Sequence, residues 1–183
     1  MRFVAILVFL AVIAAAGCGV FDSKQVTLSV AVQPDSFVVA TTQPLPSLPV
    51  DLTTLPEYNS IRSSIRGLSD LAILGRVRNN GLTFIRPEYW FTPGPTAFVN
   101  ATQVRLNGTM LWAGPELAAS PASAEFDWNK SAGLVHRDAF DAFFAEIQGD
   151  GAFTLYVIGA ITGTNYTFLM QDPRLVMVLD TEP

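Results

Sequence analysis

The residue with the clearest chemical potential in this sequence is its single cysteine, Cys18. A lone thiol can pair with another chain, remain free or be modified, because no second cysteine exists for an internal disulfide. Cys18 directly follows the small residues Ala15, Ala16 and Gly17, at the end of an uncharged run that begins at Phe3. Cys18 therefore lies directly after the kind of small-residue segment that precedes a signal-peptide cleavage site.

Residues 1–18 have the layout of a secretory signal, with Arg2 near the amino terminus, an apolar run and small residues before Cys18. The small residues before Cys18 resemble the lipobox of bacterial lipoproteins, with Ala15 where that family prefers Leu. The resemblance implies that Cys18 receives a diacylglycerol, that residues 1–17 are cleaved and that the new amino terminus is acylated. An ordinary signal peptide and an uncleaved anchor are the alternatives, although the apolar run is shorter than the roughly 20 residues of a spanning helix.

The residue after Cys18 is Gly19. In the lipoprotein family an aspartate at this place favours retention at the inner membrane, so the resemblance implies an outer-membrane address in the cell envelope. Stable anchoring takes more than one acyl chain, which a triacylated cysteine supplies. We therefore expect the membrane to be a partner of this protein through the acyl chains on Cys18.

Composition limits the other partners. The chain has 183 residues and a formal net charge of −5, and removal of residues 1–17 deletes only Arg2, leaving 10 basic against 16 acidic side chains. An acidic balance without basic clusters argues against nucleic acid. We expect a lipidated cysteine and short tether over residues 18–25, followed by a single domain over residues 26–183, which is long enough to bury a core.

Residues that could support catalysis are few. The only histidine is His136, no Gly-x-Ser-x-Gly motif or phosphate loop is present, and zinc would need more His and Cys ligands. The carboxylates Asp138, Asp141 and Asp150 could perform acid–base chemistry or hold calcium, but the first two also suit a helix start and the third a turn. We expect no enzyme activity, metal or cofactor.

Three consecutive aromatic residues, Tyr89, Trp90 and Phe91, are the most suggestive candidates for a binding surface. Successive side chains of a strand point to opposite faces of a sheet. One face would therefore join the core, while the other could cover a helix or bind an envelope protein, a lipid or a glycan.

Alternating apolar residues predict strands over 26–32, 71–79 and 124–128, and further strands are expected over 37–40, 166–170 and 175–179. Residues 152–160 are apolar on both faces, which predicts a central strand. Asn107-Gly108 predicts a type I′ hairpin between 102–106 and 109–112, and Asn79-Asn80-Gly81 predicts a tight turn between two further strand-like runs. The proline-rich residues 41–49 predict an extended crossing. Helices are expected over 54–67, which Gly67 would close, and over 137–148, where Phe140, Phe143, Phe144 and Ile147 recur at helical spacing.

These elements predict a mainly β fold, an antiparallel β-sandwich with one or two short helices at an edge or end. The helix–Gly149-Asp150-Gly151–strand segment and the strand ending at Asn79 resemble late-embryogenesis-abundant (WHy-type) sandwich domains, whose Asn-Pro-Asn motif is replaced here by Asn79-Asn80-Gly81. The first functional hypothesis is a non-enzymatic binding or assembly module. The alternatives are an envelope hydrolase that acts on glycans through carboxylates and a lipid carrier with a cavity between its sheets.

Overall fold

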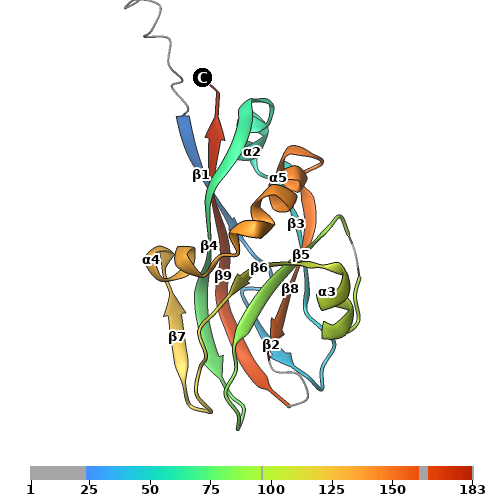
Figure 1. The fold of residues 1–183 in the computed structure, drawn as a ribbon, viewed down its shortest axis with the longest axis vertical. Coiled ribbons are helices and arrows are strands. Elements are labelled where there is room, and N and C mark those ends of the chain that lie inside the picture. Colours follow the sequence, from blue (N-terminus) through green and yellow to red (C-terminus); the bar gives the residue numbers. More distant parts are fainter. Residues whose placement is uncertain (1–23, 96, 161–164, 183) are drawn as a thin grey trace, which may run out of the picture.

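A computed structural model describes residues 24–95, 97–160 and 165–182. Their strands form two antiparallel sheets that pack face to face, with short helices at the edges and ends (Figure 1). The predicted β-sandwich is therefore confirmed. Cys18 and the segment before it lie outside the described residues.

The first sheet contains β1 (Lys24–Ala31), β2 (Ser36–Ala40), β4 (Ile65–Asn79), β7 (Ser123–Phe126) and β9 (Thr167–Thr181). Its order is β1-β9-β4-β7, and β2 pairs with the first part of β9, on the same side as β1. β4 and β9 are its long central strands (Figure 1). Gly75 lies at a break in their register, and a Cβ atom there would approach Gln171 O to 2.9 Å, so a glycine permits the β-bulge at this position.

The second sheet has the order β3-β8-β5-β6. Its strands are β3 (Ser47–Asp51), β8 (Ala152–Gly159), β5 (Pro87–Pro93) and β6 (Thr109–Ala113). β8 is buried along almost its whole length and lies between two partners, as its apolar sequence predicted. The crossing predicted over residues 41–49 is wrong in its second part, because Ser47–Asp51 pairs as an edge strand despite Pro49.

The helices are α2 (Pro56–Ile61), α3 (Ala101–Asn107), α4 (Trp128–Ser131) and α5 (Phe140–Gln148). Four 3-10 turns adjoin them: η1 (Leu52–Thr54), η2 (Arg62–Ser64), η3 (Ala132–Leu134) and η4 (Arg137–Ala139). α5 confirms the helix expected after His136. The other expected helix is shorter than predicted, because Ile65 and Gly67 already belong to β4.

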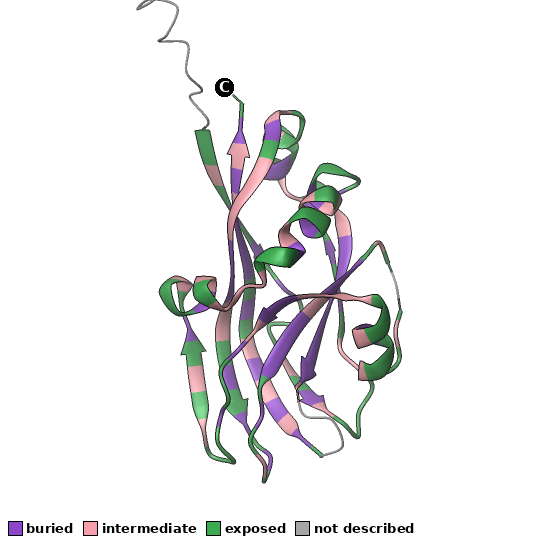
Figure 2. Cartoon of the chain, in the orientation of Figure 1, coloured by how far each residue is buried: buried purple, intermediate pink, exposed green. Residues whose placement is uncertain are grey.

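The core fills the space between the sheets and extends under α5 (Figure 2). Phe143 and Ile147 of α5 are fully buried, and Phe143 makes edge-to-face contacts with Phe91 and Phe153. Such contacts stabilise aromatic pairs beyond their buried area. α5 therefore closes one open end of the sandwich with the apolar stripe that its sequence predicted.

The predicted hairpin at Asn107-Gly108 is wrong. Residues 101–107 form α3, and Gly108 has φ −94° and ψ 169°, which a type I′ turn does not permit. The strands predicted over 166–170 and 175–179 are one strand, β9, which continues through Pro173. Asn79-Asn80-Gly81 also does not join paired strands, since β4 and β5 belong to different sheets.

Candidate functional site

The three consecutive aromatic residues do not form a binding surface. Tyr89 and Phe91 are 0% and 1% exposed and point into the core between the sheets. Trp90 lies half-buried on the opposite face of β5, where its indole Nε1 donates to Glu88 Oε2 at 3.1 Å. The alternative that these rings serve intramolecular packing is thus correct, because each side of β5 is covered by another part of the fold.

α3 covers that opposite face. Val104 is buried against Tyr156 and Ile158 of β8, with Trp90 beside them. The Glu88 carboxylate, 4% exposed, lies 3.4 Å from the Arg86 guanidinium and 3.7 Å from that of Arg105 in α3. A buried carboxylate needs such partners, so Glu88 attaches α3 to the sheet.

The other sequence-predicted candidates are not brought together. Asp138 and Asp141 are exposed at the start of α5, and Asp150 accepts a hydrogen bond from the Ala152 N–H at 2.9 Å, as a turn residue does. The backbone N–H of His136 donates to Leu111 O. Within the described residues, no group of three His, Cys, Asp or Glu side chains could hold a metal ion.

A more distinctive site lies at the end of the sandwich opposite the first residue of β1. Lys24 and Ile65 both pair with Thr181 at one end of the first sheet, whereas β4 ends at Asn79 roughly 50 Å away, for 15 residues at 3.3 Å each. The segment that follows, residues 80–84, forms the tip of that far end, and we call it the distal loop (Figure 1).

Asn79 organises the distal loop. Its fully buried side chain donates from Nδ2 to Thr83 O and Ala118 O, each at 2.7 Å, and accepts from the Gly81 N–H at 2.9 Å. The Asn80 N–H donates to Thr167 O at 3.0 Å. The loop is therefore fixed to two neighbouring segments of the chain.

The fixed loop presents apolar side chains to solvent. Leu82 is 94% exposed and Phe84 is 50% exposed. Beside them lies a pocket of about 300 Å³ whose walls include the hydroxyl and amide side chains of Thr41, Asn80 and Asn165. The sequence predicted a tight turn at Asn79-Asn80-Gly81, where such residues favour turns, but it did not identify this site.

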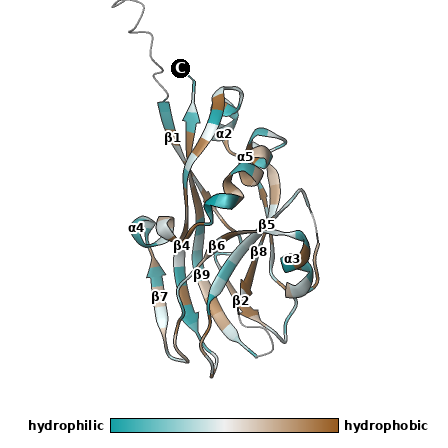
Figure 3. Cartoon of the chain, viewed as in Figure 1, coloured by the Kyte–Doolittle hydropathy of each residue, from teal (hydrophilic) through white to brown (hydrophobic). Residues whose placement is uncertain are grey.

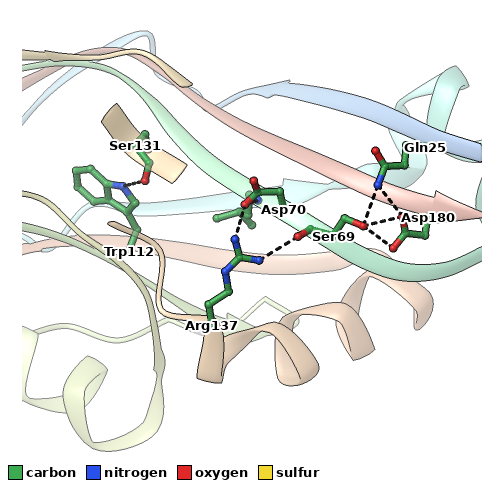
Figure 4. Close-up of polar contacts among 8 residues, drawn as sticks. Gln25, Ser69, Asp70, Trp112, Ser131, Arg137 and Asp180 are labelled. Carbon is green, nitrogen blue, oxygen red and sulfur yellow. Dashed lines mark hydrogen bonds and ion pairs between the residues drawn. The ribbon is translucent and has the colours of Figure 1, made fainter. Parts of the chain in front are cut away.

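At the other end, polar side chains connect β1 to the centre of its sheet (Figure 4). Gln25 Nε2 donates to Ser69 Oγ and Asp180 Oδ1, each at 3.2 Å. Ser69 Oγ in turn donates to the Asp180 carboxylate at 2.6 Å. The Arg137 guanidinium donates to Ser69 O at 3.0 Å and to Asp70 Oδ1 at 3.2 Å, which joins the approach to α5 to β4.

Charge and exposed apolar surface separate along the molecule. The half opposite the distal loop, called the proximal half, comprises the end of β3, η1, α2, η2, the first parts of β1 and β4, η4, α5 with the turn after it and the end of β9 (Figures 1 and 3). Among the described residues, this half holds the carboxylates Asp51, Glu57, Asp70, Asp138, Asp141, Glu146, Asp150, Asp180 and Glu182 and the cations Lys24, Arg62, Arg66 and Arg137. The remaining described residues carry equal numbers of acidic and basic side chains and all of the large exposed apolar ones: Val38, Leu82, Phe84, Val99 and Leu106.

Comparison with known proteins gives no family model that matches the chain and no matching curated protein. In the part of the chain that the structure describes, no helix combines the length and apolar character needed to cross a bilayer.

Proposed function

We propose that this protein is a lipid-anchored lipoprotein of the bacterial cell envelope, held at the outer membrane by acyl chains on Cys18, and that its sandwich domain is a non-enzymatic binding or assembly module. The distal loop is its binding element. The partner is another envelope protein with an apolar pocket that receives Leu82 and Phe84.

The sequence around Cys18 supports the anchor, and the fold is compatible with it. β1 begins at Lys24, six residues after Cys18, so the tether over residues 18–23 reaches about 20 Å when extended. Gln25 connects the first strand to β4 and β9 immediately after that tether. The domain would therefore remain close to the bilayer.

The observation that carries the binding role is the exposure of Leu82 and Phe84 on a loop that buried hydrogen bonds hold in place. Burying one such side chain contributes about 1.5–3 kcal/mol. A fixed loop loses little conformational entropy on binding, so more of that free energy remains as affinity. Exposed apolar side chains on a constrained loop therefore favour a docking role.

The anchor is tested with Cys18→Ser. The variant should lose metabolic labelling by fatty acids and leave the membrane fraction, because the thiol that accepts the lipid is gone. The wild-type chain, labelled in parallel, is the control. Labelling and membrane retention that are unchanged in the variant would exclude Cys18 as the anchor.

The binding element is tested by photocrosslinking in intact cells, with a photoreactive residue in place of Leu82. We expect a discrete adduct with one envelope protein, reduced at least tenfold by a second change, Phe84→Ser. The matched control carries the photoreactive residue at Leu106, which is 77% exposed on α3. Equal labelling from both positions would show that the distal loop is not a specific binding element.

A further inference from the structure

β1 forms the longer part of one edge of the first sheet, beside β2, and its outer side has no partner among the described residues. It pairs with β9 on one side only. The Val32 N–H donates to Pro173 O at 2.9 Å, so Val32 occupies a hydrogen-bonded position opposite β9. Because hydrogen-bonded positions alternate along an antiparallel strand, Val26, Leu28 and Val30 also exchange hydrogen bonds with β9. The N–H and C=O groups of the intervening residues, Gln25, Thr27, Ser29 and Ala31, therefore point away from the sheet.

The edges of the second sheet are protected against pairing. β3 contains Pro49, whose ring removes an N–H from the open edge. β6 is bridged by Val135 through Trp112, and the His136 N–H donates to Leu111 O on the same strand. Neither edge offers a continuous row of free backbone groups.

The far edge of the first sheet is protected as well. β7 has four residues, and its Glu125 lies 3.5 Å from the Arg76 guanidinium. Beyond β7, the Ser131 hydroxyl both accepts from the Ile73 N–H and donates to Ile73 O. The edge formed by β1 differs, because its eight residues contain no proline and only one charged side chain, Lys24 at the end.

We propose that this edge is a self-association surface, on which β1 of a second copy adds as an antiparallel strand. The two-fold axis passes at Leu28, so that Gln25 lies opposite Ala31 of the second copy and Thr27 lies opposite Ser29. This register brings all four outward-pointing residues of each copy into hydrogen-bonded pairs and continues the first sheet through both copies.

The side chains at this edge fit a second copy. Thr27 and Ser29 are small and uncharged, and the register places no like charges directly opposite one another, which would be destabilising. Asp180 is the sheet neighbour of Gln25, and Arg174 is the neighbour of Ala31. In the dimer, Gln25 of one copy faces Ala31 of the other. The row of residues that crosses the joined sheet at this point therefore has the Asp180 carboxylate of one copy on one side and the Arg174 guanidinium of the other copy on the opposite side.

The interface is small, because one strand pair covers less than the roughly 800 Å² per partner of a standard interface. Two copies held in one leaflet meet at a high effective concentration, which compensates for weak contacts. This strengthening rests on the proposed lipid anchor, whereas the pairing itself does not. Both tethers would leave the middle of the dimer, and the two distal loops would lie at its opposite ends.

Disulfide formation tests the register in the full chain in its native membrane. Hydrogen-bonded residues across an antiparallel pair have Cα atoms about 5.5 Å apart, within the range that a disulfide spans. The double variant Thr27→Cys/Ser29→Cys should form a covalent dimer at least tenfold more efficiently than either single variant, since identical residues are diagonal neighbours roughly 7–8 Å apart. Val38→Cys, on the neighbouring edge strand β2, is the matched control.

A dimer yield that does not exceed the single variants and the Val38 control would overturn the proposal, as would capture of a different protein in place of the dimer. With a photoreactive residue in place of Gln25, Ser29→Pro should reduce the crosslinked dimer at least tenfold, and Val38→Pro should not. Melting curves confirm that both variants fold. Fatty-acid labelling reports the anchor alone. The same double variant on a Cys18→Ser background, concentrated in solution, reports the pairing without the anchor, so the two failures are distinguishable.

Discussion

Two buried tyrosines, Tyr58 and Tyr89, differ in whether their hydroxyl groups make a hydrogen bond in the described structure. Tyr58 Oη donates to Ile147 O at 2.6 Å and so attaches α2 to α5. Tyr89 Oη is buried without a hydrogen-bond partner in the described structure, and burial raises the pKa of this phenol far above its ordinary value. Burial also raises the pKa of Tyr58, with the Arg62 charge opposing the shift.

This difference predicts opposite results for the same substitution. Tyr58→Phe should lower the free energy of unfolding by about 1–2 kcal/mol, because it removes a buried hydrogen bond and leaves Ile147 O unpaired. Tyr89→Phe should be neutral or stabilising, since it removes a desolvated hydroxyl that gains nothing in the fold. Urea denaturation measures both, and each variant serves as the other's control. A loss at Tyr89 equal to that at Tyr58 would show that its hydroxyl has a partner.

At single residues, the sequence does not show which distant segments of the chain pack against a side chain. The consecutive aromatics Tyr89, Trp90 and Phe91 showed that both faces of a strand would be apolar or aromatic. What covers the second face could not be read from them, because α3 and Glu88 arrive there from other parts of the chain.

At the scale of elements, α3 shows why a strong local signal failed. Asn107-Gly108 between alternating residues favoured a hairpin, but Asn100 caps a helix by accepting from the Gln103 N–H at 2.9 Å. Gln103 Oε1 accepts from the Val99 N–H at 3.0 Å in return. Such reciprocal caps start helices, and Val104 then packs on β8. The capping residues Asn100 and Gln103 can be read from the sequence. The packing of Val104 on β8, which favours the helix over a hairpin, cannot.

The distal loop gives the prediction that belongs to this scale. Asn79→Ala removes three hydrogen bonds and leaves Thr83 O, Ala118 O and the Gly81 N–H in need of partners. At about 1 kcal/mol for each bond, with unsatisfied groups adding to the cost, we expect a loss of roughly 3 kcal/mol. Asn80→Ala, at an exposed neighbour, should change the free energy of unfolding by less than about 0.5 kcal/mol.

Chemical denaturation followed by tryptophan fluorescence measures both asparagine variants. Hydrogen exchange of the Gly81 and Leu117 amides reports whether the loop itself loosens in Asn79→Ala. Equal stability of the two variants would mean that the Asn79 side chain does not hold the loop.

At the scale of the whole molecule, the sandwich class followed from many short alternating segments, but the strand order did not. The first strand β1 pairs with the last strand β9, and this pairing brings together residues more than a hundred positions apart. Such contacts leave no local pattern in the sequence, and the gathering of carboxylates in the proximal half depends on them. That half therefore carries an electrostatic cost that sequence reasoning could not foresee.

Glu146 of α5 makes that cost measurable. Burial raises its pKa above the ordinary value, and the negative charge of Asp150 adds to the shift. As the pH rises, the unfolded chain releases this proton before the folded chain does, so stability falls between the two pKa values and the cost persists above both. Glu146→Gln should thus be more stable than the wild type at pH 7 but not at pH 4, where both side chains are neutral. The control is Glu116→Gln, at an exposed residue of the other half, which should show no such pH dependence in parallel urea melts. An equal gain in stability for Glu146→Gln at both pH values would contradict the electrostatic explanation.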